Sequence, residues 1–293
     1  MRKGIAPLII GVFIIGVAAI AEVAYLTSFI SQAQPVIQTV RDVEIIRGIN
    51  GLEFAKQYLL NAALYSYYQA SYDVAKRGGN FAMESNSYNC IPYWNAYSEE
   101  FAPDFEANLK SAITSVFTKY IVTANFENLE IPTSFLVDIS DHRTLTISSA
   151  DTMKVEKKDF FTAEEMFSFS QKVDGKVFDL FSIAKNTEEI VLDLEKTALS
   201  FSDLQNKLNL MQDALNVNYG SQNIHITISA ENLASDDVNY AARILVSISD
   251  NSKYPSYDFA TKTFDERNLV FNFYILEGKS NIIQTNICED IAY

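Results

Sequence analysis

The stretch Leu52 to Lys76, LEFAKQYLLNAALYSYYQASYDVAK, carries the strongest structural pattern in the chain. Its aromatic residues recur at spacings of four, seven, three and four, namely Phe54, Tyr58, Tyr65, Tyr68 and Tyr72. Such spacings place side chains on one face of an α-helix. Apolar residues also occupy the other faces, so we expect this helix to be central in the fold. Gly78 and Gly79 are expected to end it as a C-cap. The aromatic stripe predicts core packing, and a stacked-tyrosine binding platform is the functional alternative.

Upstream, an apolar run from Ile5 to Ile30 follows two basic residues, Arg2 and Lys3. As a helix, this run would span about 39 Å, enough to cross a hydrocarbon core of roughly 30 Å. The basic residues are expected to stay on the cytoplasmic side. The sequence therefore predicts a single-pass anchor in the cell membrane over residues 1–30, with the lipid membrane as a partner. The anchor helix is expected to continue into the long helix, and the bulk of the chain is expected to be extracytoplasmic.

The mature N-terminus has three alternatives. An uncleaved signal anchor keeps the initiator residue. A secretory signal peptide would be cut by signal peptidase between Ala21 and Glu22, after the small-residue triplet AIA. The third alternative rests on resemblance, because RKG followed at once by IAPLII resembles the class III signal of archaeal type IV pilin-like proteins. That resemblance implies cleavage between Gly4 and Ile5 by a prepilin peptidase.

The same resemblance implies a retained apolar helix and a surface or pilus-associated role, with the chain itself or other pilin-like subunits as partners. The rest of the chain resembles uncharacterised archaeal membrane-anchored proteins. The residues that carry this likeness are QASYDVAKRGG, from Gln69 to Gly79, and ARILVSISDNSKYPSYDF, from Ala242 to Phe259. It implies no activity.

Composition and motifs narrow the function further. With 23 basic and 37 acidic residues the net charge is −14, and an acidic chain lacks the basic footprint that nucleic acid requires. No HExxH, CxxC, GxSxG or glycine-rich phosphate loop occurs in the sequence, and neither His142 nor His225 has a partner in the sequence that suggests a triad or a metal site. We therefore expect no enzymatic activity, no cofactor and no metal.

The two cysteines, Cys90 and Cys288, allow a disulfide in a chain that is mostly outside the cytoplasm; two free thiols are the alternative. Cys90 lies in Asn80 to Pro103, which is rich in Asn, Ser and Tyr and is predicted to be a long loop. Its aromatic cluster is the candidate ligand-contact surface, formed by Tyr88, Tyr93, Trp94 and Tyr97. The alternative is a lid packed over the core.

A helix is expected next, over Asp104 to Ile121, followed by a hairpin. Its strands are Ser134 to Ile139 and Thr144 to Ser149, joined by the turn residues DHR at 141–143.

The second half is predicted to contain two helices and a sheet. Thr162 to Lys185 predicts one helix, and Asn186 is expected to start another as its N-cap, with Glu189 completing a capping box. This second helix carries a heptad stripe through Ile190, Leu194, Thr197, Phe201, Leu204, Leu208, Met211 and Leu215. Its packing partner is either the long helix or a neighbouring subunit. Three strands follow, over Asn223–Ala230, Asn239–Ser249 and Asn268–Glu277, with turns at 250–252 and 254–255.

The predicted class is thus α+β: an N-terminal transmembrane helix continuing into a long helix, and an ectodomain of helices packed on antiparallel sheet. Three segments are expected: the anchor over 1–30, a helix-rich half with one hairpin over 31–160, and a helical hairpin with antiparallel sheet over 161–293. The predicted function is that of a pilin-like structural or adhesion protein that assembles at the cell surface. The alternative is a ligand-binding accessory or sensory ectodomain that works with a membrane partner.

Overall fold

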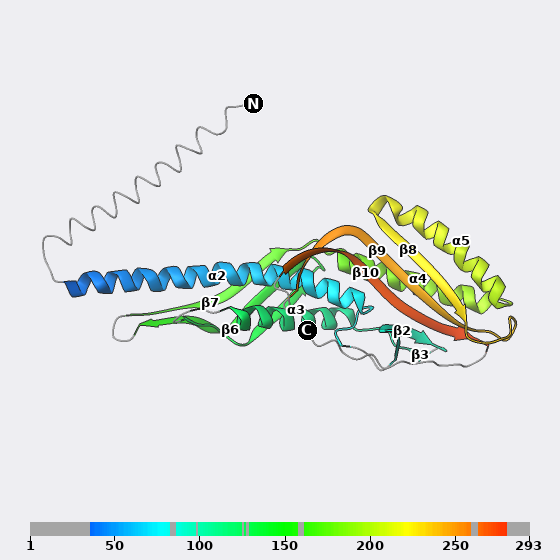
Figure 1. Cartoon of the computed structure of the whole chain (residues 1–293), viewed down its shortest axis with the longest axis horizontal. Helices are drawn as coiled ribbons and strands as arrows, with labels where there is room; N and C mark the ends of the chain where they lie inside the picture. The colour runs from blue at the N-terminus through cyan, green and yellow to red at the C-terminus, as the bar shows by residue number, and fades with distance from the viewer. Residues whose placement is uncertain are drawn as a thin grey trace, which may run out of the picture. The chain divides into compact units, whose positions relative to one another are not determined.

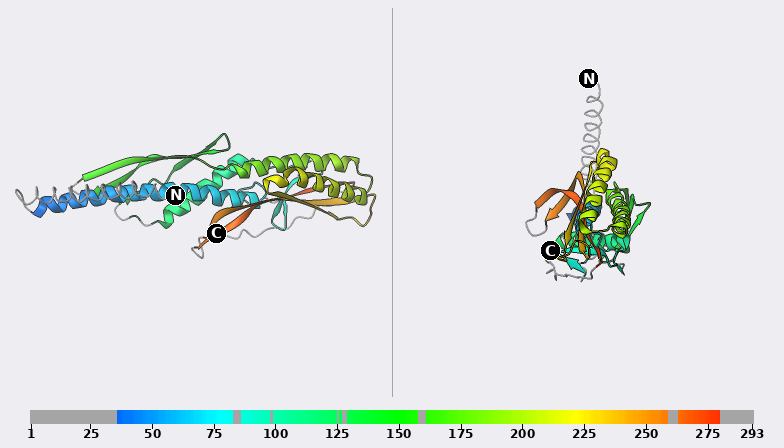
Figure 2. Two further views of the ribbon diagram at one scale, coloured as in Figure 1. Left: turned by 90° about the horizontal axis from the view of Figure 1, so that it is seen from above. Right: turned by 90° about the vertical axis from the view of Figure 1, so that its right-hand side faces the viewer.

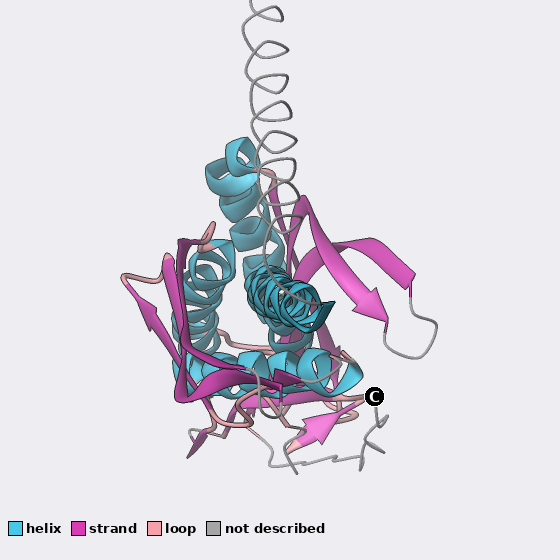
Figure 3. Ribbon diagram, turned by 90° about the vertical axis from the view of Figure 1, so that its left-hand side faces the viewer, coloured by secondary structure: helices cyan, strands magenta, loops and turns pink. Residues whose placement is uncertain are grey.

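The computed structural model describes residues 36–82, 86–97, 99–124, 126, 129–157, 161–258 and 263–279, and within them the side chains from residue 42 onward except at 157, 257 and 258. This part contains four α-helices and ten strands, so the α+β class is confirmed (Figure 3). The predicted architecture is wrong in two respects. No helix among these residues is long and apolar enough to cross a membrane. The larger of the two sheets is also mixed rather than antiparallel, because it contains one parallel pair of strands. Residues 1–30, which hold the predicted anchor and its candidate cleavage sites, lie outside the described residues.

The chain divides into two compact units, each built from separate stretches of sequence. The first holds α2 (Val36–Lys76) up to Phe54, together with Phe126–Glu130 and Lys154–Glu164. In it, β4 (Leu129–Glu130) pairs antiparallel with the end of β6 (Thr144–Lys157). A Cβ on Gly48 of α2 would lie 2.2 Å from the ring of Phe161, so the absence of a side chain at Gly48 allows that ring to pack closely on the helix.

The second unit contains the larger sheet, whose strand order is β1-β2-β10-β9-β8, with β3 on β2 (Figure 1). The strands are β1 (Ser87–Tyr88), β2 (Ile91–Ala96), β3 (Glu99–Glu100), β8 (Ile224–Asn232), β9 (Ala241–Asp258) and β10 (Thr263–Gly278). Antiparallel pairing joins β8, β9 and β10, whereas β2 runs parallel to β10. The three predicted C-terminal strands are therefore confirmed. The predicted turns at 250–252 and 254–255 are wrong, because β9 continues through both, with a register shift that pairs Asn268 with Lys253 and Leu269 with Asp250.

One face of this sheet forms the core with two helices, α4 (Lys176–Thr197) and α5 (Phe201–Tyr219). Alternate strand residues on that face are fully buried, among them Ile226, Val246, Ile248, Phe271 and Phe273. The two helices lie side by side as a helical hairpin (Figure 2). The buried residues of α5, Leu204, Leu208, Met211 and Leu215, belong to the predicted heptad stripe, and α5 packs on β8 of the same chain.

Side chains of α5 also bond to the outer edge of β8. Asn216 donates to the carbonyl of Ile226 at 2.9 Å and accepts from its N–H at 2.8 Å. Gln212 accepts from the N–H of Ile228 at 2.6 Å. An edge strand otherwise presents unpaired backbone groups on which another strand can pair. Here the side chains of a helix occupy three of those groups.

The smaller sheet has β5 (Phe135–Ser140) and β7 (Phe161–Lys172) on β6. The β5–β6 hairpin confirms the predicted pair of strands, and Asp141 and His142 form its turn with φ of 52° and 55°. The predicted helix before it is also confirmed as α3 (Phe105–Thr123), where Asp104 accepts from the N–H of Ala107 at 3.2 Å.

Two predictions about helices are wrong. Thr162 to Lys172 is strand β7 rather than helix, because Phe167 and Phe169 are buried while Ser168 and Ser170 face solvent, a period of two. The helix begins only after Gly175, whose φ is +68°. The predicted start at Asn186 is also wrong, since α4 continues to Thr197. The break falls at Ser200, which caps α5 by accepting from the N–H of Asp203.

Candidate functional site

The segment predicted as a long loop is instead a hairpin attached to the large sheet. Strands β1 and β2 pair antiparallel around Asn89 and Cys90, both of which have positive φ, 47° and 63°. Two residues with positive φ match the turn type that two-residue hairpins prefer. Because β2 then pairs with β10, the aromatic residues of the segment are held against the sheet.

Trp94 lies in the core. Its side chain is fully buried, and its ring stacks on Phe273 with a centroid separation of 4.1 Å. Its indole N–H donates to the carbonyl of Gly78, just beyond α2, at 2.8 Å. A buried indole needs such an acceptor. Trp94 therefore ties the end of α2 to β2 and β10.

Tyr88 and Tyr93 belong to a second cluster, organised by Arg243 of β9. The guanidinium carbon of Arg243 lies 3.4 Å from the ring centroid of Tyr88 and 5.8 Å from that of Tyr274. Arg243 is 5% exposed and pairs with Glu231 of β8. Burial opposes its charge, but hydrogen bonds with Glu231 and Tyr93 outweigh that cost and raise the pKa of Arg243. The cluster is a cation held among aromatic rings.

The four predicted contact residues therefore do not form one exposed surface. Tyr93 and Trp94 are buried, whereas Tyr88 and Tyr97 are half-buried beside other partly covered apolar residues. The burial follows from the pairing of β2 with β10, which the composition of the segment does not reveal. Cys90 in the same hairpin is disulfide-bonded. Cys288 lies outside the described residues, so the pairing of the two stays a prediction.

The two histidines occupy different places. His142 stacks on Phe178 of α4 with ring centroids 4.5 Å apart, and His225 is exposed on β8. In the part of the chain that the structure describes, no three His, Cys, Asp or Glu side chains gather as a metal site would require.

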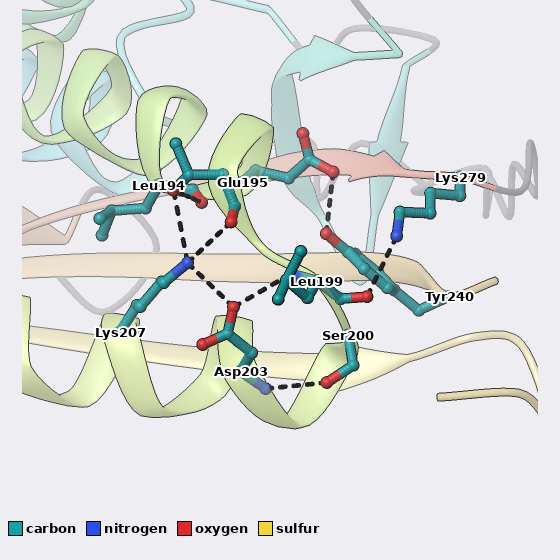
Figure 4. Close-up of polar contacts among 9 residues, drawn as sticks. Leu194, Glu195, Leu199, Ser200, Asp203, Lys207, Tyr240 and Lys279 are labelled. Atoms are coloured by element: carbon teal, nitrogen blue, oxygen red, sulfur yellow. Dashed lines mark hydrogen bonds and ion pairs between the residues drawn. The ribbon is translucent and has the colours of Figure 1, made fainter. Parts of the chain in front are cut away.

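Polar side chains at the α4–α5 turn form hydrogen bonds and an ion pair that stabilise the turn (Figure 4). Lys207 donates to the carbonyl of Thr197 at 2.9 Å and pairs with Asp203 at the same distance. Asp203 also accepts from the N–H of Leu199, and these contacts lower the pKa of its carboxyl. Lys279 donates to the carbonyl of Leu199 at 3.1 Å. These bonds satisfy backbone groups that helix ends leave unpaired.

Tyr240 fixes the other side of the same turn. Its hydroxyl donates to Glu195 of α4 at 3.0 Å, and burial together with this carboxylate raises the pKa of Tyr240 (Figure 4). A tyrosine with a raised pKa keeps its proton and acts as a hydrogen-bond donor. These polar residues therefore have a structural role, which is to fix the turn between α4 and α5.

A concave site lies along the second half of α2. A groove of about 310 Å³ is lined by Tyr58, Asn61, Ala62, Tyr65, Tyr120, Thr123 and Phe264. It joins α2, the end of α3 and the start of β10. Two of these residues, Tyr58 and Tyr65, belong to the aromatic stripe for which core packing was expected. That expectation is wrong for part of the stripe, since Phe54 is 68% exposed and Tyr65 is 36% exposed.

The buried face of this helix is formed instead mainly by smaller residues, including Ala55, Leu59, Ala62, Ala63 and Ala70. Sequence reasoning found the α2 wall of the groove through its periodicity. Phe264 gave no comparable signal, because it reaches the groove only through the pairing of β10.

Comparison with family models, with curated proteins and with solved structures finds no match to this chain.

Proposed function

We propose that this chain is an extracytoplasmic structural protein that acts by adhesion and by assembly with copies of itself or with pilin-like subunits. The observation that carries the proposal is the exposed face of the first half of α2. Val43, Ile46 and Ile49 are 43%, 52% and 47% exposed, and Phe54 is more exposed still. At 3.6 residues per turn these four side chains fall within an arc of about 140°.

The opposite side of the same helix is covered. Gly48 and Leu52 are buried there. Leaving large apolar side chains in water costs about 25 cal/mol for each Å² exposed. Asp42, Asn50 and Glu53 are also exposed within this arc, so polar side chains are interspersed among the apolar ones. Large apolar side chains gathered on one exposed face often mark an interaction site. A second helix packed on this face would remove its four side chains from water.

The disulfide at Cys90 supports a place outside the cytoplasm. Disulfides persist in oxidising compartments and are rare where thiols are kept reduced.

Self-association of the full-length chain tests the assembly role. Sedimentation velocity would compare the wild type with the triple variant Val43→Gln, Ile46→Gln, Ile49→Gln. A matched control replaces Leu210 and Val217, exposed apolar residues of α5, by Gln. We expect oligomers in the wild type and the control and their loss in the triple variant. A monomeric wild type, or equal association of all three chains, would refute the proposal.

The mature N-terminus tests the pilin-like part separately. Intact mass and N-terminal sequencing of the natively isolated protein should give Ile5 as the first residue. An N-terminus at Glu22 or at Met1 would contradict prepilin-type processing.

A second function, that of a ligand-binding ectodomain, is favoured by the groove along the second half of α2. Its volume falls at the lower end of the roughly 300 to 1,000 Å³ common for small-molecule sites.

A further inference from the structure

The groove is walled by aromatic rings from elements far apart in the sequence. Tyr65 of α2 and Phe264 of β10 lie with ring centroids 5.1 Å apart at an interplanar angle of 49°. Tyr58 is fixed on the α3 side, since its hydroxyl donates to the carbonyl of Tyr120 at 2.9 Å. The rings therefore form a wall whose α2 and α3 sides are joined by a hydrogen bond.

The same groove carries polar groups without formal charge. Asn61 and Thr123 are both exposed at its lining, and none of the seven lining residues is acidic or basic. The Thr123 hydroxyl donates to the carbonyl of Lys119 at 2.6 Å, which leaves its oxygen able to accept from a ligand. The Asn61 amide offers both a donor and an acceptor.

Three features of the site define the ligand that fits. The absence of charge in the lining favours a neutral molecule, because an ion would lose hydration without gaining a counter-charge. The aromatic rings require an apolar surface on the ligand. A pure hydrocarbon would cover the Asn61 amide and the Thr123 oxygen without bonding to either, whereas a ligand with hydroxyl groups can bond to both.

We propose that this groove binds a neutral sugar residue of a glycan. A pyranose ring combines an apolar face of C–H groups, which can lie on the rings of Tyr65 and Phe264, with hydroxyls at its edge, which can bond to Asn61 and Thr123. The inference deepens the adhesion and ligand-binding roles proposed above and rests on them. It gives the chain a glycan-covered surface as its target.

Saturation-transfer difference NMR on the full-length chain tests this inference. The probes are four neutral trisaccharides, maltotriose, cellotriose, mannotriose and N-acetylated chitotriose, with the acidic monosaccharide N-acetylneuraminic acid as a comparison. We expect transfer to the ring C–H protons of at least one neutral probe and none to N-acetylneuraminic acid. Tyr65→Ala and Phe264→Ala should each weaken binding at least tenfold. Both side chains are substantially exposed, so the fold should survive their removal.

Two further variants separate the contributions. Tyr65→Phe keeps the ring and should retain most of the binding, whereas Asn61→Ala should lose a hydrogen bond and weaken it severalfold. Leu210→Ala, an exposed apolar residue on α5, is the matched control and should bind as the wild type does.

The result that overturns the inference is the absence of transfer to every neutral sugar, or transfer that Tyr65→Ala and Phe264→Ala leave unchanged. A second probe is the neutral fluorophore N-phenyl-1-naphthylamine. If the chain binds this fluorophore but no sugar, and the same two variants abolish that binding, the groove is a site for an apolar ligand and the glycan inference is overturned. Self-association is measured independently by sedimentation. A chain that assembles but binds no sugar overturns this inference alone.

Discussion

Replacing Gly78 by Ala perturbs the point where α2, β2 and β10 meet. Gly78 lies two residues beyond α2 with φ of +58°. A Cβ at this position would lie 2.4 Å from the carbonyl oxygen of Asn272 and 2.7 Å from the side chain of Pro92. The carbonyl of Gly78 also accepts the indole N–H of Trp94. Backbone conformation, close packing and a buried hydrogen bond thus depend on one residue.

The magnitude follows from these three terms. A left-handed conformation costs a residue with a Cβ about 1 to 2 kcal/mol. The contact with Asn272 is with backbone, so the chain has to move, and this movement disturbs a hydrogen bond worth about 1 kcal/mol. Together we expect Gly78→Ala to lower the free energy of unfolding by about 2 to 4 kcal/mol, a large fraction of a typical domain's stability.

Urea denaturation followed by fluorescence measures this effect directly, because Trp94 is the sole tryptophan and contacts Gly78. The matched control is Gly220→Ala, where φ is −60° and nothing lies within 4 Å of an added Cβ. It should be neutral or slightly stabilising. If the two variants unfold at the same urea concentration, the reasoning about Gly78 is refuted.

Three further variants test other parts of the fold. Gly51→Ala, in the interior of α2 with open space around it, should stabilise the chain by about 1 kcal/mol, seen as a higher Tm; a lower Tm would contradict the helix. Asn216→Ala leaves two backbone groups of Ile226 without their partner and should cost about 1 to 3 kcal/mol by urea denaturation, and an unchanged midpoint would show that the edge contact contributes nothing. Burial raises the pKa of Asp73, despite the hydrogen bond from Gln69 that lowers it, so the folded chain holds this proton more tightly than the unfolded chain. The contribution of Asp73 to stability is then full below its unfolded pKa of about 3.9 and is lost as pH rises through the folded value. The stability of Asp73→Asn relative to the wild type should therefore increase with pH, and a difference independent of pH would argue against a raised pKa.

Periodicity in the sequence is sufficient to predict a helix or strand where only one face of that element is buried. The helix over Asp104 to Ile121 and the hairpin turn at Asp141 were predictable because local residue types and burial pattern agree there. Thr162 to Lys172 was mispredicted, because FTAEEMFSFSQK mixes helix-favouring residues with an alternation that only pairing with β6 stabilises. At Asn186 a local capping pattern lost to the burial of α4 on both sides of it.

Sequence periodicity predicts only the α2 side of the candidate groove. The spacing of Tyr58 and Tyr65 marks one face of a helix, and their sequence positions alone suffice to place them together. Phe264 joins them only after β9 and β10 pair, so no local pattern contains it. Trp94 illustrates the converse: a segment rich in turn-forming residues became a core strand through contact with β10.

The hydrogen bonds between α5 and β8 depend on a match between the spacing of residues along the helix and along the strand. Four residues of helix, from Gln212 to Asn216, advance about 6 Å along the axis. Two residues of strand, from Ile226 to Ile228, advance about 6.6 to 6.8 Å. The two repeats nearly match, so the helix meets successive outward-facing peptide groups much as a neighbouring strand would. A shift of α5 by a single residue would break all three bonds. The three backbone groups of Ile226 and Ile228 that these bonds occupy are therefore closed to strand addition, and copies of the chain cannot pair through them.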